Sequence, residues 1–240
     1  MSQDCESSET AAARLAAVRG RIAETCRRCG RDPASVQLVA VSKRRSIEAA
    51  QELHASGQVD FGENYPQELW KKAEILKNDN LRWHLIGHLQ SNKLTKTYSV
   101  VHMIHAVDSL KLLRQLDEHA ARLGNPPRVC LQVNCSGEVS KHGWSAASIL
   151  ADAPSIAACA HIPIVGLMTM AALADNPEQA RPAFRELRNT RDQLRGLTGL
   201  PLPELSMGMS NDYTVAIEEG ATWVRIGTAL FEGGTKACLM

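Results

Sequence analysis

Short runs of aliphatic residues recur along the chain, and in the stretches between them apolar residues return every three or four positions. The aliphatic runs are typical of strands buried on both faces of a parallel sheet. The return of apolar residues every three or four positions indicates amphipathic helices. The first run, VQLVAVSK, covers 36–43, and an amphipathic helix over 10–29 comes before it. Seven further strands are expected, at 59–62, 81–87, 100–107, 128–134, 162–168, 203–208 and 223–227.

A helical pattern follows nearly every expected strand. The helices are expected at 46–57, 65–76, 91–97, 108–123, 145–160, 176–197 and 213–219. This alternation implies right-handed crossovers and a parallel sheet. Eight such units in 240 residues fit an α/β fold of the closed (β/α)8 TIM-barrel type, with an extra N-terminal helix. The rival, an open doubly wound sheet, predicts a GxGxxG turn after the first strand, where this chain has SKRRS.

Composition and charge narrow the class of protein. No Pro- or Ser-rich linker interrupts the pattern, so we expect one domain over 1–240, with flexible ends at 1–9 and 234–240. The formal charge of +1 gives no general attraction to nucleic acid. No apolar segment approaches the ~18 residues of a membrane span, and the polar N-terminus does not resemble a signal peptide. We therefore expect a cytoplasmic, monomeric protein without membrane or nucleic-acid partners.

The cysteines and histidines give no metal site at the level of the sequence. Cys26 and Cys29 form a CxxC inside an expected helix, and no second pair has metal spacing, so free thiols are expected. His84 and His88 flank the end of a strand, and no carboxylate completes a site with them. Both histidines are expected to line the mouth of the barrel, and no metal ligand is assigned.

The segment 205–228, LSMGMSNDYTVAIEEGATWVRIGT, places two loops of small residues after consecutive strands. In barrels of this kind the loops after the seventh and eighth strands often bind a phosphate. Turn N–H groups, hydroxyls and a helix N-terminus supply the contacts. The alternative is a pair of ordinary tight turns that use glycine at positive φ. The position of both loops on one edge favours a ligand that carries a phosphate.

Lys43 ends the first expected strand, on the inside of the barrel mouth if the alternation of the strand continues to it. A lysine there is either a solvated surface charge or a functional amine. An amine beside a phosphate site suggests a Schiff base with a phosphorylated aldehyde. Pyridoxal 5'-phosphate (PLP) has this chemistry, because it carries an aldehyde and a phosphate on one ring.

Eight motifs resemble the pyridoxal-phosphate homeostasis proteins, the YggS/PROSC family. They occur in the family's order and extend over nearly the whole chain. The motifs are AVSK at 40–43, FGENY at 61–65, WHLIGHLQSNK at 83–93, VDS at 107–109, QVNCSGEVSKHG at 132–143, GLMTM at 166–170, LSMGMSND at 205–212 and RIGTALF at 225–231.

The resemblance implies a barrel similar to the N-terminal domain of alanine racemase, with PLP covalently bound to Lys43. It also implies roles for seven further residues. Ser206, Ser210, Gly227 and Thr228 would hold the phosphate, Arg225 would lie near the pyridine nitrogen, and Asn64 and the Met207 backbone would lie around the ring.

The implied function is non-catalytic: intracellular PLP homeostasis, in which the protein buffers the cofactor and delivers it to apo-forms of PLP enzymes. A guanidinium such as that of Arg225 disfavours protonation of the ring nitrogen and so weakens the ring as an electron sink. Racemases of this fold use a tyrosine of a second domain as the opposing base, and we expect no such domain because the sequence ends at Met240. The alternatives are a PLP-dependent amino-acid racemase or other weak PLP enzyme, and a phosphosugar enzyme that uses Lys43 in an aldolase-type Schiff base.

Three segments depart from the family pattern or stay ambiguous. Arg44, Arg45 and Ser46 stand where the family usually has Thr-Lys-Pro. Cys135 replaces a usual threonine, and it is either an oxidisable thiol near the site or a tolerated small residue. The loop over 136–143 is long and polar, so it is either a mobile flap or a partner contact.

Overall fold

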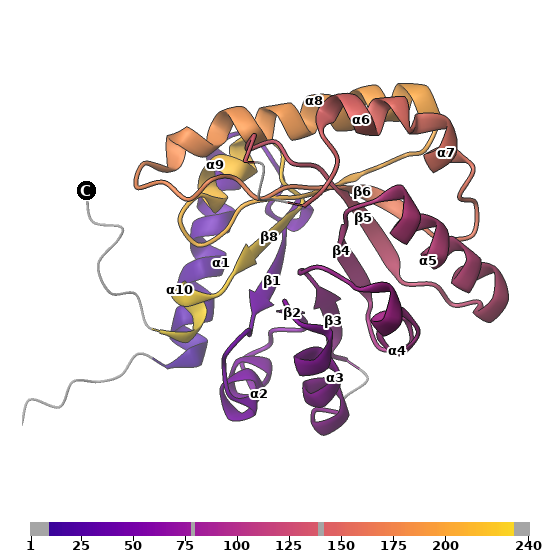
Figure 1. Cartoon of the computed structure of the whole chain (residues 1–240). Coiled ribbons are helices and arrows are strands. Elements are labelled where there is room, and N and C mark those ends of the chain that lie inside the picture. The colour runs from indigo at the N-terminus through magenta and orange to yellow at the C-terminus, as the bar shows by residue number, and fades with distance from the viewer. Residues whose placement is uncertain (1–9, 78–79, 139–141, 233–240) are drawn as a thin grey trace, which may run out of the picture.

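The computed structural model describes residues 10–77, 80–138 and 142–232. Eight parallel strands pair in sequence order and close into a barrel, β1 to β8, with helices outside them (Figure 1). The (β/α)8 architecture predicted from the strand–helix alternation is thereby confirmed. The two ends that we expected to be flexible lie outside the described residues. None of the described helices is both long enough and apolar enough to cross a lipid bilayer.

The strands are β1 (Gln37–Val41), β2 (Asp60–Glu63), β3 (Arg82–Leu85), β4 (Met103–Val107), β5 (Arg128–Gln132), β6 (Ile164–Met168), β7 (Glu204–Ser206) and β8 (Trp223–Ile226). The α-helices are α1 (Ala11–Arg28), α2 (Ile47–Ala55), α3 (Pro66–Ile75), α4 (Leu94–Tyr98), α5 (Leu110–Leu123), α6 (Ala146–Ala151), α7 (Ala153–Ala157), α8 (Arg181–Thr198), α9 (Tyr213–Glu218) and α10 (Thr228–Phe231). Short 3-10 turns are η1 (Pro33–Ser35), η2 (Ser91–Lys93) and η3 (Pro177–Ala180).

The differences from the expected elements arise at prolines and at element ends. The helix expected over 145–160 is split at Asp152, because Pro154 stands in the first turn of α7 and removes a backbone donor. The helix expected over 176–197 begins as the 3-10 turn η3 and becomes α-helical from Arg181. The expected strand over 100–107 starts only at Met103, since Val100 and Val101 donate back to Thr97 in the turn that follows α4. Neither η1 nor α10 was predicted.

Side chains of the strands alternate between the barrel interior and the helix layer. In β1, Leu38 and Ala40 pack in the large outer core with the helices, whereas Val39 packs in the inner cluster with Met103 and Trp223. The same alternation turns Val41 and Lys43 inward at the mouth of the barrel, where both line a cavity. The position predicted for Lys43 from this alternation is confirmed.

The barrel closes where β1 pairs with β8, in the register of Gln37 with Trp223 and Ala40 with Ile226. Figure 1 shows the N-terminal helix α1 alongside this closure, next to α9 and α10. Arg31, just beyond the end of α1, donates to the carbonyl of Ile217 in α9 at 2.6 Å. The extra helix therefore braces the last two βα units against the first strand.

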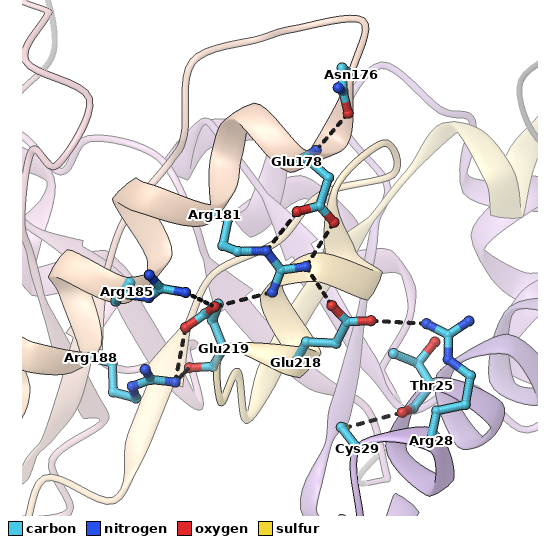
Figure 2. A network of polar contacts seen from close by, with 10 residues as sticks. All are labelled: Thr25, Arg28, Cys29, Asn176, Glu178, Arg181, Arg185, Arg188, Glu218 and Glu219. Carbon is cyan, nitrogen blue, oxygen red and sulfur yellow. Dashed lines mark hydrogen bonds and ion pairs between the residues drawn. The ribbon is translucent and has the colours of Figure 1, made fainter.

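A network of arginines and glutamates joins α8, α9 and α1 on the outside of the barrel (Figure 2). Arg181 of α8 contacts Glu178, Glu218 and Glu219 at 2.6–3.1 Å. Glu218 continues to Arg28 of α1 at 2.9 Å. Arg185 and Arg188 also pair with Glu219, at 3.2 and 3.0 Å. Networks of charges hold geometry better than isolated surface pairs, so this one fixes α9, the helix that follows the loop after β7.

Gly166 of β6 is required by a close backbone approach. A Cβ atom at this position would lie 1.9 Å from the carbonyl oxygen of Glu204 in the neighbouring β7. We predict that Gly166→Ala lowers the free energy of unfolding by at least about 2 kcal/mol, because the strands must separate to admit the methyl group. Urea titration of both proteins measures the difference.

Gly196 provides the matched control, since a Cβ there would meet nothing within 4 Å and the residue lies inside α8. Gly196→Ala is expected to stabilise the protein by about 0.5–1 kcal/mol, through the higher helix propensity of alanine. Equal effects of the two substitutions would contradict the account of the β6–β7 contact.

Candidate functional site

A cavity of about 340 Å³ lies at the C-terminal ends of the strands. It brings together six residues that the sequence analysis singled out: Lys43, Asn64, Ser210, Arg225, Gly227 and Thr228. The loop after β6 covers part of it with Leu173 and Asn176, and Asp212 from the loop after β7 also lines it. The volume falls in the range of about 300–1,000 Å³ that is typical of small-molecule sites.

The backbone around Lys43 is held in a tight turn. Arg45 N–H donates to the carbonyl of Ser42 at 3.0 Å, and Arg44 between them has φ +59°. The left-handed backbone conformation costs a residue such as Arg44 roughly 1 kcal/mol, so contacts of the neighbouring residues must stabilise the turn. The Lys43 side chain itself is exposed.

A buried ion pair stabilises this turn from the outer side of the barrel. Lys72 of α3 donates to the Ser42 carbonyl at 2.7 Å and to Glu63 Oε1 at 2.6 Å. The Ser42 hydroxyl donates to the same Glu63 oxygen at 2.7 Å. Removing one partner of a fully buried pair leaves an uncompensated charge and costs several kcal/mol, which makes this contact a rigid support for Lys43.

The loops after β7 and β8 form the other wall. Gly208 has φ +94°, and a Cβ on it would lie 2.7 Å from the Ala216 side chain, so the loop lies close against α9. Asp212 fixes the loop further, since its Oδ1 accepts from Met209 N–H at 2.6 Å. Gly227 N–H points to the Ser210 hydroxyl at 3.4 Å, and Thr228 begins α10. Backbone N–H groups and hydroxyls meet here in the manner of an anion site.

Ser206 and Met207 lie below the described lining of the cavity. The Met207 N–H donates to the Trp223 carbonyl at 3.1 Å in the β7–β8 ladder. The Ser206 side chain is buried and contacts Arg225 and His105. The Ser206 hydroxyl thus lies between Arg225 and His105 in the barrel interior, and Ser206 is not among the described residues that line the cavity.

A chain of hydrogen bonds runs through the barrel interior to Arg225. Arg225 Nη1 donates to Ser206 Oγ at 2.6 Å, and Ser206 Oγ lies 2.7 Å from His105 Nδ1. His105 Nε2 lies 2.9 Å from His84 Nδ1, and His84 Nε2 lies 2.9 Å from Asp60 Oδ1. All five side chains are at most 4% exposed.

The two ends of this chain fix the direction of every bond in it. A guanidinium can only donate and a carboxylate can only accept. His84 therefore donates from Nε2 to Asp60 and accepts at Nδ1, which makes His105 the donor at its own Nε2. His105 Nδ1 then accepts the Ser206 proton, and the Ser206 oxygen accepts from Arg225. In each of the four hydrogen bonds one donor therefore meets one acceptor, and no two donors face each other.

The charges agree with this direction. Burial opposes ionisation of Asp60, yet the hydrogen bonds from His84 and Arg82 and the positive charge of Arg82 bring its pKa below the usual value. Burial lowers the pKa of His84 and of His105, so both imidazoles are neutral at pH 7. Burial lowers the pKa of Arg225 to about 10, so it stays protonated there. Arg225 also donates to the Thr169 carbonyl at 2.9 Å, which fixes the plane of its guanidinium.

Sequence reasoning placed one of these residues wrongly and did not single out two others. His84 was expected to line the mouth, but it is fully buried in the barrel interior, because it alternates inward one layer below the rim. Asp60 and His105 were not singled out. The sequence did contain one signal, because Asp60 and His105 occupy inward positions of their strands, as His84 does. Which of these side chains form hydrogen bonds with one another depends on the closure of the barrel.

The two ambiguous features next to the site have different outcomes. Burial raises the pKa of Cys135 to about 12, which suppresses the thiolate and favours a small packing residue over an oxidisable thiol. Residues 139–141 of the polar loop lie outside the described residues, so its expected role as flap or partner contact stays a prediction.

Comparisons with known proteins agree with this geometry. The model of the alanine racemase N-terminal domain matches residues 14–234. A curated pyridoxal phosphate homeostasis protein of Pseudomonas aeruginosa is 43% identical over 222 residues, which cover 92% of this chain and 95% of that protein. The chain therefore belongs to the alanine racemase N-terminal domain family, among the pyridoxal phosphate homeostasis proteins.

Solved structures support the same assignment. PipY of Synechococcus elongatus PCC7942, solved with PLP bound, has a TM-score of 0.81 and 39% identity, over 92% of this chain and 99% of that one. Alanine racemase of Corynebacterium glutamicum has a TM-score of 0.72 over 94% of this chain and 63% of that one. At 18% identity, the likeness to the racemase concerns the fold alone.

The direction of the interior chain can be measured by NMR of protein labelled with nitrogen isotope in its histidines. We predict that His84 and His105 are both neutral and both protonated at Nε2. In Asp60→Asn the end group is neutral and can donate as well as accept, so His84 and, because its Nε2 faces His84 Nδ1, also His105 are expected to populate the Nδ1–H tautomer. Asp117→Asn, which changes a carboxylate paired with the exposed His161, is the control and should leave both tautomers unchanged.

His102 gives a prediction for the pH dependence of stability. Burial and the nearby charges of Arg82 and Arg128 lower its pKa to about 4. In the unfolded chain the His102 imidazole takes up a proton below about pH 6.5, whereas in the folded chain it stays neutral down to about pH 4. The contribution of His102 to the free energy of unfolding is therefore fully present above pH 6.5 and is lost as the pH falls toward 4. His102→Gln should reduce the slope of unfolding free energy in this window by about 1.4 kcal/mol per pH unit. Identical slopes in urea titrations of the two proteins would contradict this assignment.

Proposed function

We propose that this protein binds PLP in the barrel-mouth cavity, holds it covalently through Lys43, and acts in PLP homeostasis as a carrier and not as an enzyme. The observation that supports the proposal most is the cavity itself, in which a primary amine, a wall suited to an anion and a buried guanidinium face one space. Ser210, Gly227 and Thr228 would hold the phosphate, and Lys43 is the amine that lines the same cavity.

The residues present fit such a ligand. When bound, PLP supplies an aldehyde that condenses with a primary amine and releases water. Lys43 provides that amine on a turn supported by the Glu63–Lys72 pair. Asn64, which also lines the cavity, would contact the ring. The loop that begins at Met207 also lines the cavity and would contact the ring as well. Because the Lys43 side chain is exposed, water can reach its bond to the ligand, and hydrolysis would return the free amine and the free aldehyde.

Arg225 would face the pyridine nitrogen. It keeps its proton at pH 7, and the interior chain holds it in place from behind. A fixed cation at that position disfavours a second positive charge on the ring, so the ring withdraws electrons weakly. Ser206, in the position the structure gives it, would serve the phosphate only indirectly, by orienting Arg225.

The racemase alternative requires a second acid–base group that faces Lys43 across the ligand. No tyrosine or histidine is among the described residues that line the cavity. Asp212 lines it, but its Oδ1 accepts from Met209 N–H at 2.6 Å and holds the loop after β7. A carrier that delivers PLP to apo-forms of other enzymes is therefore the better reading of the site.

The test is titration of the purified protein with PLP, followed by borohydride reduction and peptide mapping. We expect a visible absorption band of lysine-bound pyridoxal and a reduced label on Lys43. Lys43→Ala should lose both, because Lys43 is the one lysine among the described residues that line the cavity. Lys111→Ala, on the exposed side of α5, is the matched control and should keep both.

Two results would contradict the proposal. A colourless wild-type protein, or a label on a residue other than Lys43, would exclude the covalent site. Sustained exchange of the α-hydrogen of amino acids with solvent deuterium, at ordinary enzyme rates, would exclude the non-catalytic role.

A further inference from the structure

Three neighbouring loops bring together two imidazoles and a carboxylate on the rim of the barrel. His88 follows β3, Asp108 follows β4, and His142 lies in the loop after β5. One potential ligand atom of each lies within 4.8 Å of the other two. His88 Nδ1 is 2.6 Å from Asp108 Oδ2, and the rings of His88 and His142 stack at 4.9 Å between centroids. We propose that these three residues bind a divalent transition-metal ion.

The backbone positions of His88 and Asp108 are fixed by their neighbours. Gly87 packs so closely on the backbone of Asn64 that a Cβ would lie 2.2 Å from the Asn64 carbonyl oxygen. Asp108 follows the last residue of β4 directly, and Ser109 after it caps α5 through the Leu112 N–H at 3.3 Å. Neither loop can carry its side chain away from the rim without breaking these contacts.

His142 is anchored equally well, although it lies in a long loop. Its carbonyl accepts from Gln132 Nε2 at 2.7 Å. Gly143 has φ +115° and packs on the Gln132 backbone, where a Cβ would lie 2.7 Å from the carbonyl oxygen. Trp144 then pairs with β5, donating to the Gln132 carbonyl at 3.0 Å. The loop thus returns to the strand at His142, and the imidazole is held beside His88.

The donor set selects the class of ion. Two nitrogens and one carboxylate suit zinc, cobalt, nickel or copper, whereas magnesium and calcium prefer oxygen ligands alone. Ligand distances of about 2.0–2.2 Å require the three atoms to move closer together than they are. His88 and His142 are exposed, so rotation of their side chains can bring the three ligand atoms closer together while the backbones stay in place. Three protein ligands leave a position open to water or to a further ligand.

Zinc binding to the protein without PLP tests this proposal independently of the proposed function. Calorimetry with Zn²⁺ on chelator-treated protein should give one site per chain, and Co²⁺ should give a visible spectrum without thiolate bands. His88→Ala, Asp108→Asn and His142→Ala should each weaken binding by at least about tenfold, since even outer partners of a metal site are worth 10–100-fold. Thermal unfolding confirms that each variant is folded.

The matched control is His161→Ala. His161 is an exposed histidine that contacts a carboxylate, Asp117, at 3.2 Å, but it belongs to no such group of three among the described residues. Its replacement should leave zinc binding unchanged. The proposal is overturned if the wild type binds no zinc, if the three variants bind it as tightly as the wild type, or if Co²⁺ shows thiolate bands that identify cysteines as the ligands.

Discussion

The closure of eight parallel strands at the β1–β8 pair is the constraint on which the site depends. Only in a closed barrel do the ends of all strands meet around one rim, so that Lys43 after β1 comes next to the loops after β8 and β7. The same closure turns alternate side chains of every strand toward one axis. The cavity above and the interior hydrogen bonds below it are two consequences of this arrangement.

The upper interior of the barrel holds a polar chain where many barrels hold aliphatic layers. Burying Asp60, His84, His105, Ser206 and Arg225 together carries a large desolvation cost, which is offset only because each donor meets an acceptor. The result is a guanidinium of fixed position and charge at the floor of the cavity. In the proposed carrier, a guanidinium held by these hydrogen bonds would orient the ligand without a change of protonation at neutral pH.

The rim divides into two regions with different chemistry. Around the cavity an amine, hydroxyls and backbone N–H groups suit an anionic aldehyde. On the side of β3 to β5 the imidazoles of His88 and His142 flank the Asp108 carboxylate and suit a cation. Gly87, which lines the cavity, is the residue before His88, so an ion there would lie beside the entrance. A metal cation and an anionic ligand would then lie at the same opening of the barrel.

The sequence by itself determined the barrel, the inward direction of Lys43 and the two loops of small residues, because period-two burial and strand-to-helix alternation are local properties. It also indicated six residues of the cavity lining through family motifs: Lys43, Asn64, Ser210, Arg225, Gly227 and Thr228. It could not pair Ser206 with Arg225, His84 with Asp60 or Asp108 with His88, since each of these contacts joins side chains of different strands or of the loops that follow them, and depends on how those strands pack together. The local sequence pattern likewise does not show which group donates in each hydrogen bond between Asp60 and Arg225. Only the tertiary structure decided it, because a donor is assigned by the partner that packing brings within about 3 Å.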